Sequence, residues 1–394
     1  MRNLENKSSI CINRGWFWVE KIISTSSIFL LSRPLVMSLL LNQPSKLCFR
    51  KPVLVRSSPR HSNALSSLVL QSDCHSFVLI CADPCGGNLG KAKIKRYGLR
   101  YKNLSYEELC IKLEEDDKKE AKLLRDLLKE MGTIGSSSGW LPTLKDGVLR
   151  LREISENNDT EPKRILLPPL VTLPHCQTQY VTNVAMSSSF PEEEDCVVAV
   201  KFLGPQLSFC RPARNNSEWI NIRMTDPCFF SSPVMFSKKD DMFRIAGSGG
   251  HLIGSWDLQN HSNNPKLQIL RFQNLPKLSE TKRNLLDSCY TSEHLVESIT
   301  TSETFMVKLY RKTTEIVKGI PKRETVAIMV FRLDEEGNAV YTQDIGDQSI
   351  FITNSEAFCV PSSSIFFLRQ PNYVEFFNVD EHRLSMRIKQ KWDC

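Results

Sequence analysis

From residue 132 to the end of the chain, short stretches in which apolar and polar residues alternate are separated by turn sequences. A period of two residues is typical of β-strands that bury one face, whereas a helix repeats about every 3.6 residues. In the clearest unit, residues 240–272, two apolar strands flank the turn Gly247-Ser248-Gly249-Gly250, and a third strand follows Pro265. This pattern restricts the fold to all-β architectures built from antiparallel hairpins.

Strands of this kind recur along roughly 250 residues with almost no helical pattern between them. They are expected at residues 77–81, 140–144, 148–154, 180–186, 196–203, 206–211, 219–224, 234–236, 242–245, 251–258, 267–272, 294–299, 304–312, 325–333, 340–345, 349–353 and 373–379. Tight hairpins are expected at Asp146-Gly147 and Gly337-Asn338. A proline-rich connection is expected at residues 166–174 and a short helical turn at 280–287.

An aromatic residue followed by an acidic one recurs with a loose period, which favours a repeated unit. The pairs are Trp140/Asp146, Trp219/Asp226, Trp256/Asp257 and Phe331/Asp334. A single small sheet cannot bury both of its faces, and radial stacking of several sheets solves that problem. The sequence therefore predicts a β-propeller of about five to six antiparallel blades, rather than a sandwich, over residues 132–394.

Residues 73–131 carry a first strand, a loop rich in glycine, lysine and arginine at 86–101, and an amphipathic helix. Ser105 and Glu108 form a capping box, and Gly132 marks the end of the helix. Leucines at three- and four-residue spacing, such as Leu109 and Leu113, place an apolar stripe on one face. Docking against the chain's own domain is the favoured interpretation, and a partner-binding helix is the alternative.

The first 72 residues read as a leader. From Lys21 to Ser72 there are seven Lys or Arg residues, many serines and no acid, which is typical of an organelle transit peptide. We expect translation to start at Met37, with residues 1–36 as an upstream extension, and delivery to mitochondria, with chloroplast or dual delivery as the alternative. A disordered basic leader without a targeting function is the remaining interpretation. Ser32, Arg33 and Pro34 split the apolar stretch 28–41, so no membrane span is expected.

The net charge of +7 might suggest a nucleic-acid partner, but the charge is unevenly placed. Residues 1–68 hold ten Lys or Arg against two acids, a surplus of eight, so the rest of the chain carries a net charge of −1. A nearly neutral body does not predict binding to a phosphate backbone. The 13 cysteines are scattered, which fits reduced thiols better than a disulfide framework.

No motif of the chain predicts a catalytic, cofactor-binding or metal-ligating residue. Cys74, His75, Cys81 and Cys85 are close in sequence, but they lack paired zinc-ligand spacing and are interpreted as core residues. The glycine turn before His251 lacks the strand-to-helix setting of a phosphate loop and is expected to be a tight β-turn. His175 and His251 have no partner at metal or triad spacing, and the acidic run 192–195 is interpreted as a solvated loop.

Four segments carry a likeness to a known family: LPPLVTLPH (167–175), EEEDCVVAVKFLGPQLSFCRPARNNSEW (192–219), MFSKKDDMFRIAGSGGHLIGSWDL (235–258) and MVFRLDEEGNAVYTQDIGDQSIFI (329–352). They resemble the plant domain-of-unknown-function family 295, the KIB-type β-propeller proteins, and most closely its organellar branch. The resemblance implies a propeller fold and mitochondrial or occasionally chloroplast delivery. It is interrupted at residues 89–119, and the end RIKQKWDC diverges where the last blade should close.

Some members of that family carry an F-box and act as substrate receptors of ubiquitin ligases, but no F-box helix bundle precedes the propeller here. We therefore expect a non-enzymatic organellar propeller that presents a surface to an unknown protein partner, in an oligomeric state that stays open. A substrate-receptor relative that has lost its F-box and a diverged, non-functional member are alternatives. An enzyme with a site in the central channel would require several His, Asp or Glu side chains to converge there.

Overall fold

The structure is a computed structural model of the chain, and it describes residues 76–82, 92–98, 134–154, 161–178, 180–257, 264–317, 320–353, 356–364, 371–377 and 384–388. The expected leader and the expected helix at 105–131 lie outside these ranges. Contacts divide the chain into a unit of residues 1–66 and 316–321 and a larger unit of the rest. The account below concerns the larger unit.

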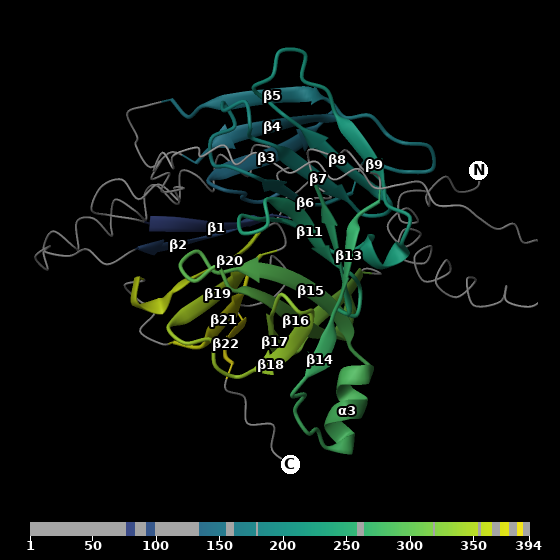
Figure 1. Cartoon of the computed structure of the whole chain (residues 1–394), viewed down its shortest axis with the longest axis vertical. Helices are drawn as coiled ribbons and strands as arrows, with labels where there is room; N and C mark the ends of the chain where they lie inside the picture. The colour runs from purple at the N-terminus through teal and green to yellow at the C-terminus, as the bar shows by residue number, and fades with distance from the viewer. Residues whose placement is uncertain are drawn as a thin grey trace, which may run out of the picture. The chain divides into compact units, whose positions relative to one another are not determined.

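In the described part of the chain, five sheets follow one another from residue 140 onward (Figure 1). The first holds β3 (Trp140–Lys145), β4 (Val148–Glu153) and β5 (Arg164–Pro169); the second holds β6 (Val181–Met186), β7 (Val198–Phe202), β8 (Gln206–Cys210) and β9 (Ile220–Arg223). The third holds β10 (Val234–Ser237), β11 (Met242–Ala246), β12 (Leu252–Trp256) and β13 (Lys266–Ile269). The fourth holds β14 (Arg271–Gln273), β15 (Tyr290–Glu297), β16 (Thr304–Val317), β17 (Ile320–Leu333) and β18 (Asn338–Thr342). The fifth holds β19 (Gln348–Ile352), β20 (Ala357–Pro361), β21 (Tyr373–Phe376) and β22 (Leu384–Arg387).

Two further elements complete the described part. The strands β1 (Ser76–Ala82) and β2 (Ala92–Gly98) form a separate antiparallel hairpin. The helix α3 (Glu280–Asp287) stands where the sequence predicts a helical turn, and the Ser279 hydroxyl caps it by accepting a hydrogen bond from the Lys282 amide. None of the helices described is both long enough and apolar enough to cross a membrane.

The predicted hairpin turns are confirmed by their backbone geometry. Asp146 and Gly147 have φ of 54° and 74° between β3 and β4, as a two-residue turn of type I′ requires. Gly337, with φ of 84°, closes the turn between β17 and β18, and the Asp334 carboxylate accepts hydrogen bonds there from the backbone amide and the side-chain amide of Asn338. Asp and Asn bind their own backbone in turns, which makes these segments favourable reversals.

Because successive side chains of a strand point to opposite faces, a strand inside the propeller contacts one neighbouring sheet with each face. In β11, Phe243 and Ile245 belong to the core cluster shared with the second sheet, whereas Ala246 belongs to the cluster shared with the fourth. The aromatic residues of the predicted repeat, Trp140, Trp219, Trp256 and Phe331, are each less than a tenth exposed, and each lies in or beside a different sheet. The aromatic repeat in the sequence therefore marks the blades.

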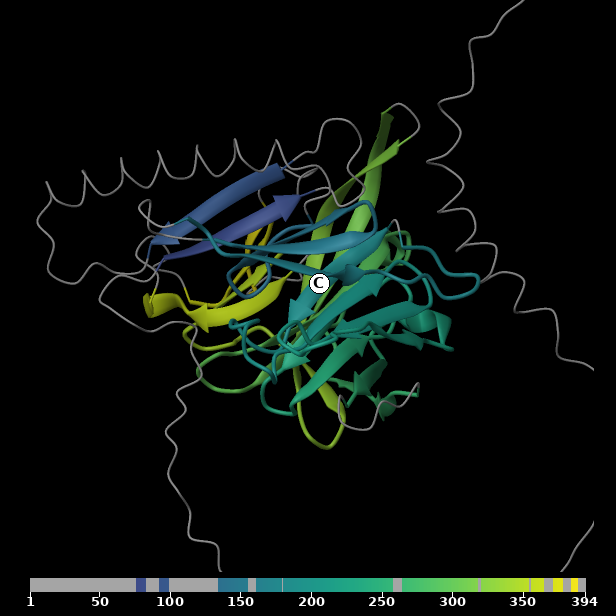
Figure 2. The ribbon, with the colours of Figure 1, turned by 90° about the horizontal axis from the view of Figure 1, so that it is seen from above.

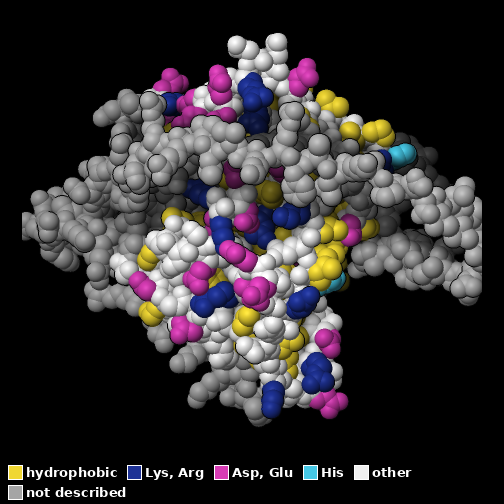
Figure 3. All heavy atoms as spheres, viewed as in Figure 1, with side chains coloured by type: hydrophobic (Ala, Val, Ile, Leu, Met, Phe, Trp, Pro, Cys, Tyr) yellow, Lys and Arg dark blue, Asp and Glu magenta, His cyan; other side chains and the backbone are white. Residues whose placement is uncertain are grey.

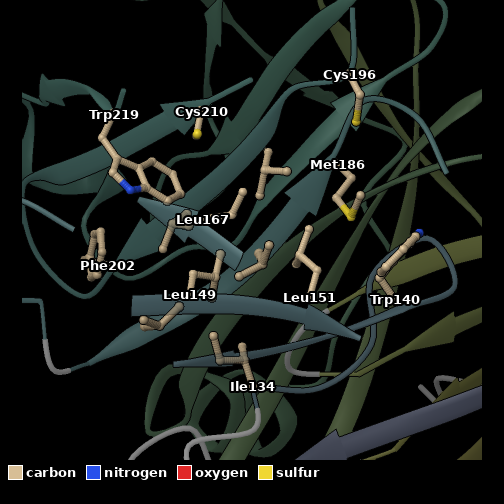
Figure 4. Packing of buried hydrophobic residues seen from close by; sticks show 14 residues of the cluster. Ile134, Trp140, Leu149, Leu151, Leu167, Met186, Cys196, Phe202, Cys210 and Trp219 are labelled. Atoms are coloured by element: carbon tan, nitrogen blue, oxygen red, sulfur yellow. The ribbon is translucent and has the colours of Figure 1, made fainter. Parts of the chain in front are cut away.

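The first and second sheets share one of these cores, shown in Figure 4. Its members are Ile134, Trp140, Leu149, Leu151, Leu167, Val181, Val184, Met186, Cys196, Val198, Val200, Phe202, Cys210 and Trp219. The indole Nε1 of Trp140 donates to Ser189 O at 2.9 Å, and that of Trp219 donates to Pro168 O at 2.7 Å. The two indoles thus pack in the core and also join the two sheets through hydrogen bonds.

Polar contacts join each sheet to the next in chain order. Asn183 of the second sheet exchanges two hydrogen bonds with Val234 of the third, at 2.7 and 2.9 Å. The Ser237 hydroxyl of the third sheet donates to Glu297 of the fourth at 2.7 Å. The Ser298 hydroxyl, which directly follows β15, donates to Gln348 of the fifth sheet at 3.3 Å.

The fifth sheet is joined back to the first. The Ser138 amide, just before β3, donates to the Glu356 carboxylate at 3.0 Å, and the Ser136 hydroxyl donates to its other oxygen at 3.4 Å. In Figures 1 and 2 the fifth sheet, in yellow, and the third sheet, in green, lie on different sides of the unit. A cyclic order of sheets, each packed on the next, is a β-propeller, so the predicted all-β fold is confirmed.

Several local expectations are wrong. Strand β2 lies where a loop was expected, and β5 occupies part of the expected proline-rich connection. The expected strand 267–272 is divided at Leu270 into β13 of the third sheet and β14 of the fourth. The pairs β14–β18 and β19–β21 are parallel, and β20 and β22 were not predicted. The division at Leu270 and the parallel pair β14–β18 depend on residues far apart in the chain, which local periodicity does not report. Strands β2, β5, β20 and β22 pair with their neighbours along the chain and lack a clear alternation of their own.

Candidate functional site: the outer strand of the third sheet

The residues weighed as possible site residues in the sequence take structural roles or stand apart from one another. The glycine turn is the predicted β-turn: Gly250 donates to Gly247 O at 2.8 Å, and Gly249 and Gly250 have φ of 88° and 78°. At Gly250 a Cβ would lie 2.9 Å from Met306 Sδ, so a larger residue would require the Met306 side chain to move in addition to adopting a positive φ. Both His175 and His251 are exposed.

The other candidate groups lead to no metal site in the described part of the chain. The acidic run 192–195 is exposed, as predicted, and Glu192 pairs with Lys163 at 2.8 Å. Within the ranges that the structure describes, no three His, Cys, Asp or Glu side chains lie together as metal ligands would. The side chains of Cys74, His75, Cys81 and Cys85 lie outside the described residues.

Buried Lys201 of β7 binds the segment that connects the second sheet to the third. Its ammonium donates to the carbonyl oxygens of Phe202, Gly204 and Phe230, the last at 2.8 Å. Burial lowers the pKa of Lys201 to about 7, because the neutral amine is favoured where water is excluded. All three of its acceptors are backbone carbonyls, so the lysine acts as a donor between elements of the fold.

Glu293 and Lys308 form a buried pair between the third and fourth sheets. They are direct cross-strand partners on β15 and β16, their charged atoms lie 3.6 Å apart, and Lys308 also donates to Gly249 O at 3.4 Å. Burial raises the pKa of Glu293, and the Lys308 charge opposes that shift. Burial together with the nearby Glu293 raises the pKa of Tyr310 to about 12. The pair thus fixes the glycine turn against the fourth sheet.

A second polar group lies at the other end of the same interface. Arg244 donates to Asp240 at 2.8 Å and to Gln268 at 2.9 Å, and Glu297 accepts from Ser237 and from the Lys239 amide. Burial lowers the pKa of Arg244, while Asp240 and Glu297 act against that shift. Both acids and the arginine are therefore committed to contacts that join β10, β11, β13 and β15.

His294 points away from Glu293, because neighbouring residues of β15 face opposite sides of the sheet. Its Nε2 lies 3.2 Å from the Ser292 hydroxyl, and burial followed by the Arg311 charge lowers the pKa of His294 to about 4. Glu293 and His294 consequently do not share a site. Strands β6, β10, β15 and β20 make contacts between neighbouring sheets. Of these four strands, β15 is the one that contains Asp, Glu or His residues, so such side chains do not converge there from several sheets.

An unusual surface lies on the outer strand of the third sheet, β13. Leu267 is 55% exposed and Ile269 is 70% exposed, and both lie on the same face of the strand because they are two residues apart. Hydrophobic side chains gather over this strand in Figure 3. β13 pairs with β12 along one edge and is the terminal strand of its sheet. We call the exposed side of residues 266–275 the β13 rim.

The chain matches the model of the KIB1-4 beta-propeller family over residues 110–387, which is more than half of its length. It belongs to that family. The predicted resemblance is thus confirmed at the level of the KIB-type propeller. A search of curated proteins finds no match.

Sequence reasoning missed the buried charged residues beside the third sheet of this KIB1-4 propeller, which lie on β7 and β15 of its neighbours. Lys201 is the only charged residue in the apolar run 197–203, and Glu293 and His294 stand directly before the apolar residues Leu295 and Val296. A charged residue within or beside an apolar run was therefore the available signal. The β13 rim has a signal of its own: residues 258–279 contain no Asp or Glu. That absence is visible only when composition is read over the segment rather than residue by residue.

Proposed function

We propose that this KIB1-4 propeller is a non-enzymatic interaction module that binds a protein partner. The observation that carries the proposal is the contrast between its ionisable and its apolar groups. Lys201, Glu293, Arg244 and Glu297 are engaged in joining sheets, whereas Leu267 and Ile269 are exposed side by side on a strand at a sheet edge. Exposed aliphatic residues that lie together are typical of binding surfaces.

A direct test of this proposal uses a photo-crosslinking amino acid at Ile269 in the full chain, expressed in its own cells. We expect a single crosslinked protein of defined mass that is present in amounts comparable to the propeller. The matched control carries the same amino acid at Leu166, which is 68% exposed on the outer strand of the first sheet. Crosslinks of equal yield and pattern at both positions, or none at Ile269, would argue against a partner at this surface.

We also propose that the protein acts in mitochondria, with chloroplast or dual delivery as the alternative. The basic, acid-free composition from Lys21 to Ser72 supports this proposal, because such segments are drawn toward a negatively charged compartment. N-terminal sequencing of the protein isolated from purified mitochondria tests it. The expected result is a processed N-terminus beyond Met37, and recovery of the intact chain from the cytosol alone would contradict it.

A further inference from the structure

The free edge of β13 offers backbone hydrogen-bonding groups as well as side chains. The Leu270 amide donates to His251 O at 2.8 Å on the β12 side. Backbone groups alternate between the two edges of a strand, so those of Leu267 and Ile269 face away from β12. The Ile269 carbonyl approaches Gly337, where a Cβ would lie only 2.8 Å from that oxygen. The N–H groups of both residues and the Leu267 carbonyl therefore point to the open side.

This edge differs from the outer strands of the first and second sheets. Strand β5 of the first sheet ends in Pro168 and Pro169, and proline cannot donate to a neighbouring strand. Strand β9 of the second sheet exposes one large aliphatic residue, Ile220, which is 39% exposed. β13 contains no proline and exposes two such residues. Of these three edges it is the one best suited to pair with another strand.

The charge along the segment itself is one-sided, and the acidic turn that holds Asp334 and Glu336 lies beside its β14 end, where Gln273 donates to Asn338 and Asn338 donates to Asp334. The positive charge that no acid borders is therefore at the Lys266 end. Residues 258–279 hold Lys266, Arg271 and Lys277 but no acid, in a chain that contains 44 Asp and Glu residues. Lys266 and Arg271 are exposed, and no ion pair is recorded for any of these three side chains in the part of the chain that the structure describes. A partner that covers Leu267 and Ile269 would meet this positive charge at its border.

We propose that the β13 rim binds an extended segment of a partner protein in which aliphatic residues alternate with acidic ones. The segment adds as a strand to the free edge of β13, with its aliphatic side chains beside Leu267 and Ile269 and its carboxylates near Lys266 and Arg271. Strand addition combines main-chain hydrogen bonds with alternating side-chain contacts, which are the two features that this edge offers. This inference rests on the proposed interaction function and names the chemistry of the partner.

The probe is a fluorescent ten-residue peptide in which isoleucine alternates with glutamate, titrated against the full chain and followed by anisotropy. Three control peptides carry lysine in place of glutamate, the same residues in blocks rather than in alternation, or N-methyl groups on alternate backbone nitrogens. We expect only the alternating acidic peptide to bind. Equal binding of the lysine peptide would overturn the charge argument, and equal binding of the N-methylated peptide would overturn strand addition.

Variants of exposed residues locate the site without threatening the core. Ile269→Lys removes apolar contact and should weaken binding at least about tenfold. The pair Lys266→Glu with Arg271→Glu should weaken it by a similar factor, less so at high salt. Leu166→Lys, which alters an equally exposed leucine on β5, should leave binding unchanged. Loss of binding in Leu166→Lys, or none in Ile269→Lys, contradicts the inference.

Light scattering separates a second copy of the chain from a different partner. A wild-type dimer that becomes a monomer in Ile269→Lys, without peptide binding, would mean that two β13 edges pair with each other and would overturn the proposal. Failure of this inference can be distinguished from failure of the proposed interaction function. A partner crosslinked at Ile269 that lacks an acidic, alternating segment leaves the interaction function in place but refutes the inferred chemistry.

Discussion

The third sheet packs against the second mainly through aromatic rings, and against the fourth through a mixture of apolar residues and charged pairs. Toward the second sheet lie the rings of Phe209, Phe243, Phe229 and Trp256, with centroids 5.2 Å apart for Phe209 and Phe243 and 5.9 Å for Phe229 and Trp256. Toward the fourth lie Arg244, the Gly249 carbonyl that accepts from Lys308, and the Ser237 hydroxyl that donates to Glu297. The same strands supply both interfaces by alternation, since Phe243 and Arg244 are adjacent in sequence.

The difference between the two interfaces shows how one sheet can be both stabilised and held in a fixed position. Apolar contact contributes most of the stabilisation but tolerates sliding, because it has no directional component. Hydrogen-bonded pairs contribute less net free energy and constrain position, since their geometry is narrow. We infer that the interface with the second sheet supplies stability, and that the interface with the fourth fixes the glycine turn and, through Gln268, the position of β13.

The largest effect is expected at the interface with the second sheet. Trp256→Ala should lower the free energy of unfolding by about 3–5 kcal/mol, because the indole is 2% exposed and its removal leaves a cavity. Urea unfolding followed by circular dichroism measures the change. Ile269→Ala, on the exposed face of the neighbouring strand, should change it by about 0.5 kcal/mol or less. Equal losses in the two variants would remove the basis for the comparison.

The next effect concerns the interface with the fourth sheet. Lys308→Met should destabilise the protein by about 3 kcal/mol, because it leaves the Glu293 carboxylate buried without its counter-charge. Adding Glu293→Gln to that variant should restore much of the loss, since the uncompensated charge is then gone. A double-mutant cycle in urea gives the coupling free energy. Additive losses in the double variant would show that the pair does not act as a unit.

How far the sequence predicted this arrangement depends on the range of each interaction. The turn at Asp146-Gly147 and the helix at 280–287 were predicted because their signals are local. The recurring aromatic residues predicted the repeated sheets, since each blade needs a large side chain in its core. The division of 267–272 at Leu270 could not be read, because both halves alternate alike and only pairing with β12 or β18 distinguishes them. The roles of Lys201 and Glu293 likewise depend on Phe230 O and on Lys308, which other segments of the chain bring near them.

The two interfaces should also differ in the sign of their pH dependence. The folded-state pKa of Lys201 is about 7, below its usual 10.5, so the folded state disfavours the proton and stability rises with pH over that interval, by about 2 kcal/mol from pH 7 to 9. The pKa of Glu293 is raised, so its contribution falls as pH rises above the usual 4.5.

Unfolding titrations of Lys201→Met and Glu293→Gln, each compared with the wild type, measure these two slopes. The first variant should lose the rise above pH 7, and it should be less stable than the wild type at pH 9, because the carbonyls around Lys201 then have no amine to donate to them. The second should lose the fall above pH 4.5. If both residues contributed slopes of the same sign to the pH dependence of unfolding, the expected opposite shifts of their pKa values would be contradicted.

The smallest effect separates position from stability at the interface with the fourth sheet. Ser237→Ala removes the hydroxyl that donates to Glu297 at 2.7 Å and accepts from the Asp240 amide at 3.2 Å. We expect a loss of about 1 kcal/mol in urea unfolding, the typical net value of a buried hydrogen bond. Ser248→Ala, which alters an exposed residue of the glycine turn, is the matched control and should have no measurable effect. Because these contacts position β13, Ser237→Ala should also speed amide hydrogen exchange in β13 and leave exchange in β7 unchanged. Equal acceleration in both strands would mean that the hydroxyl only adds stability.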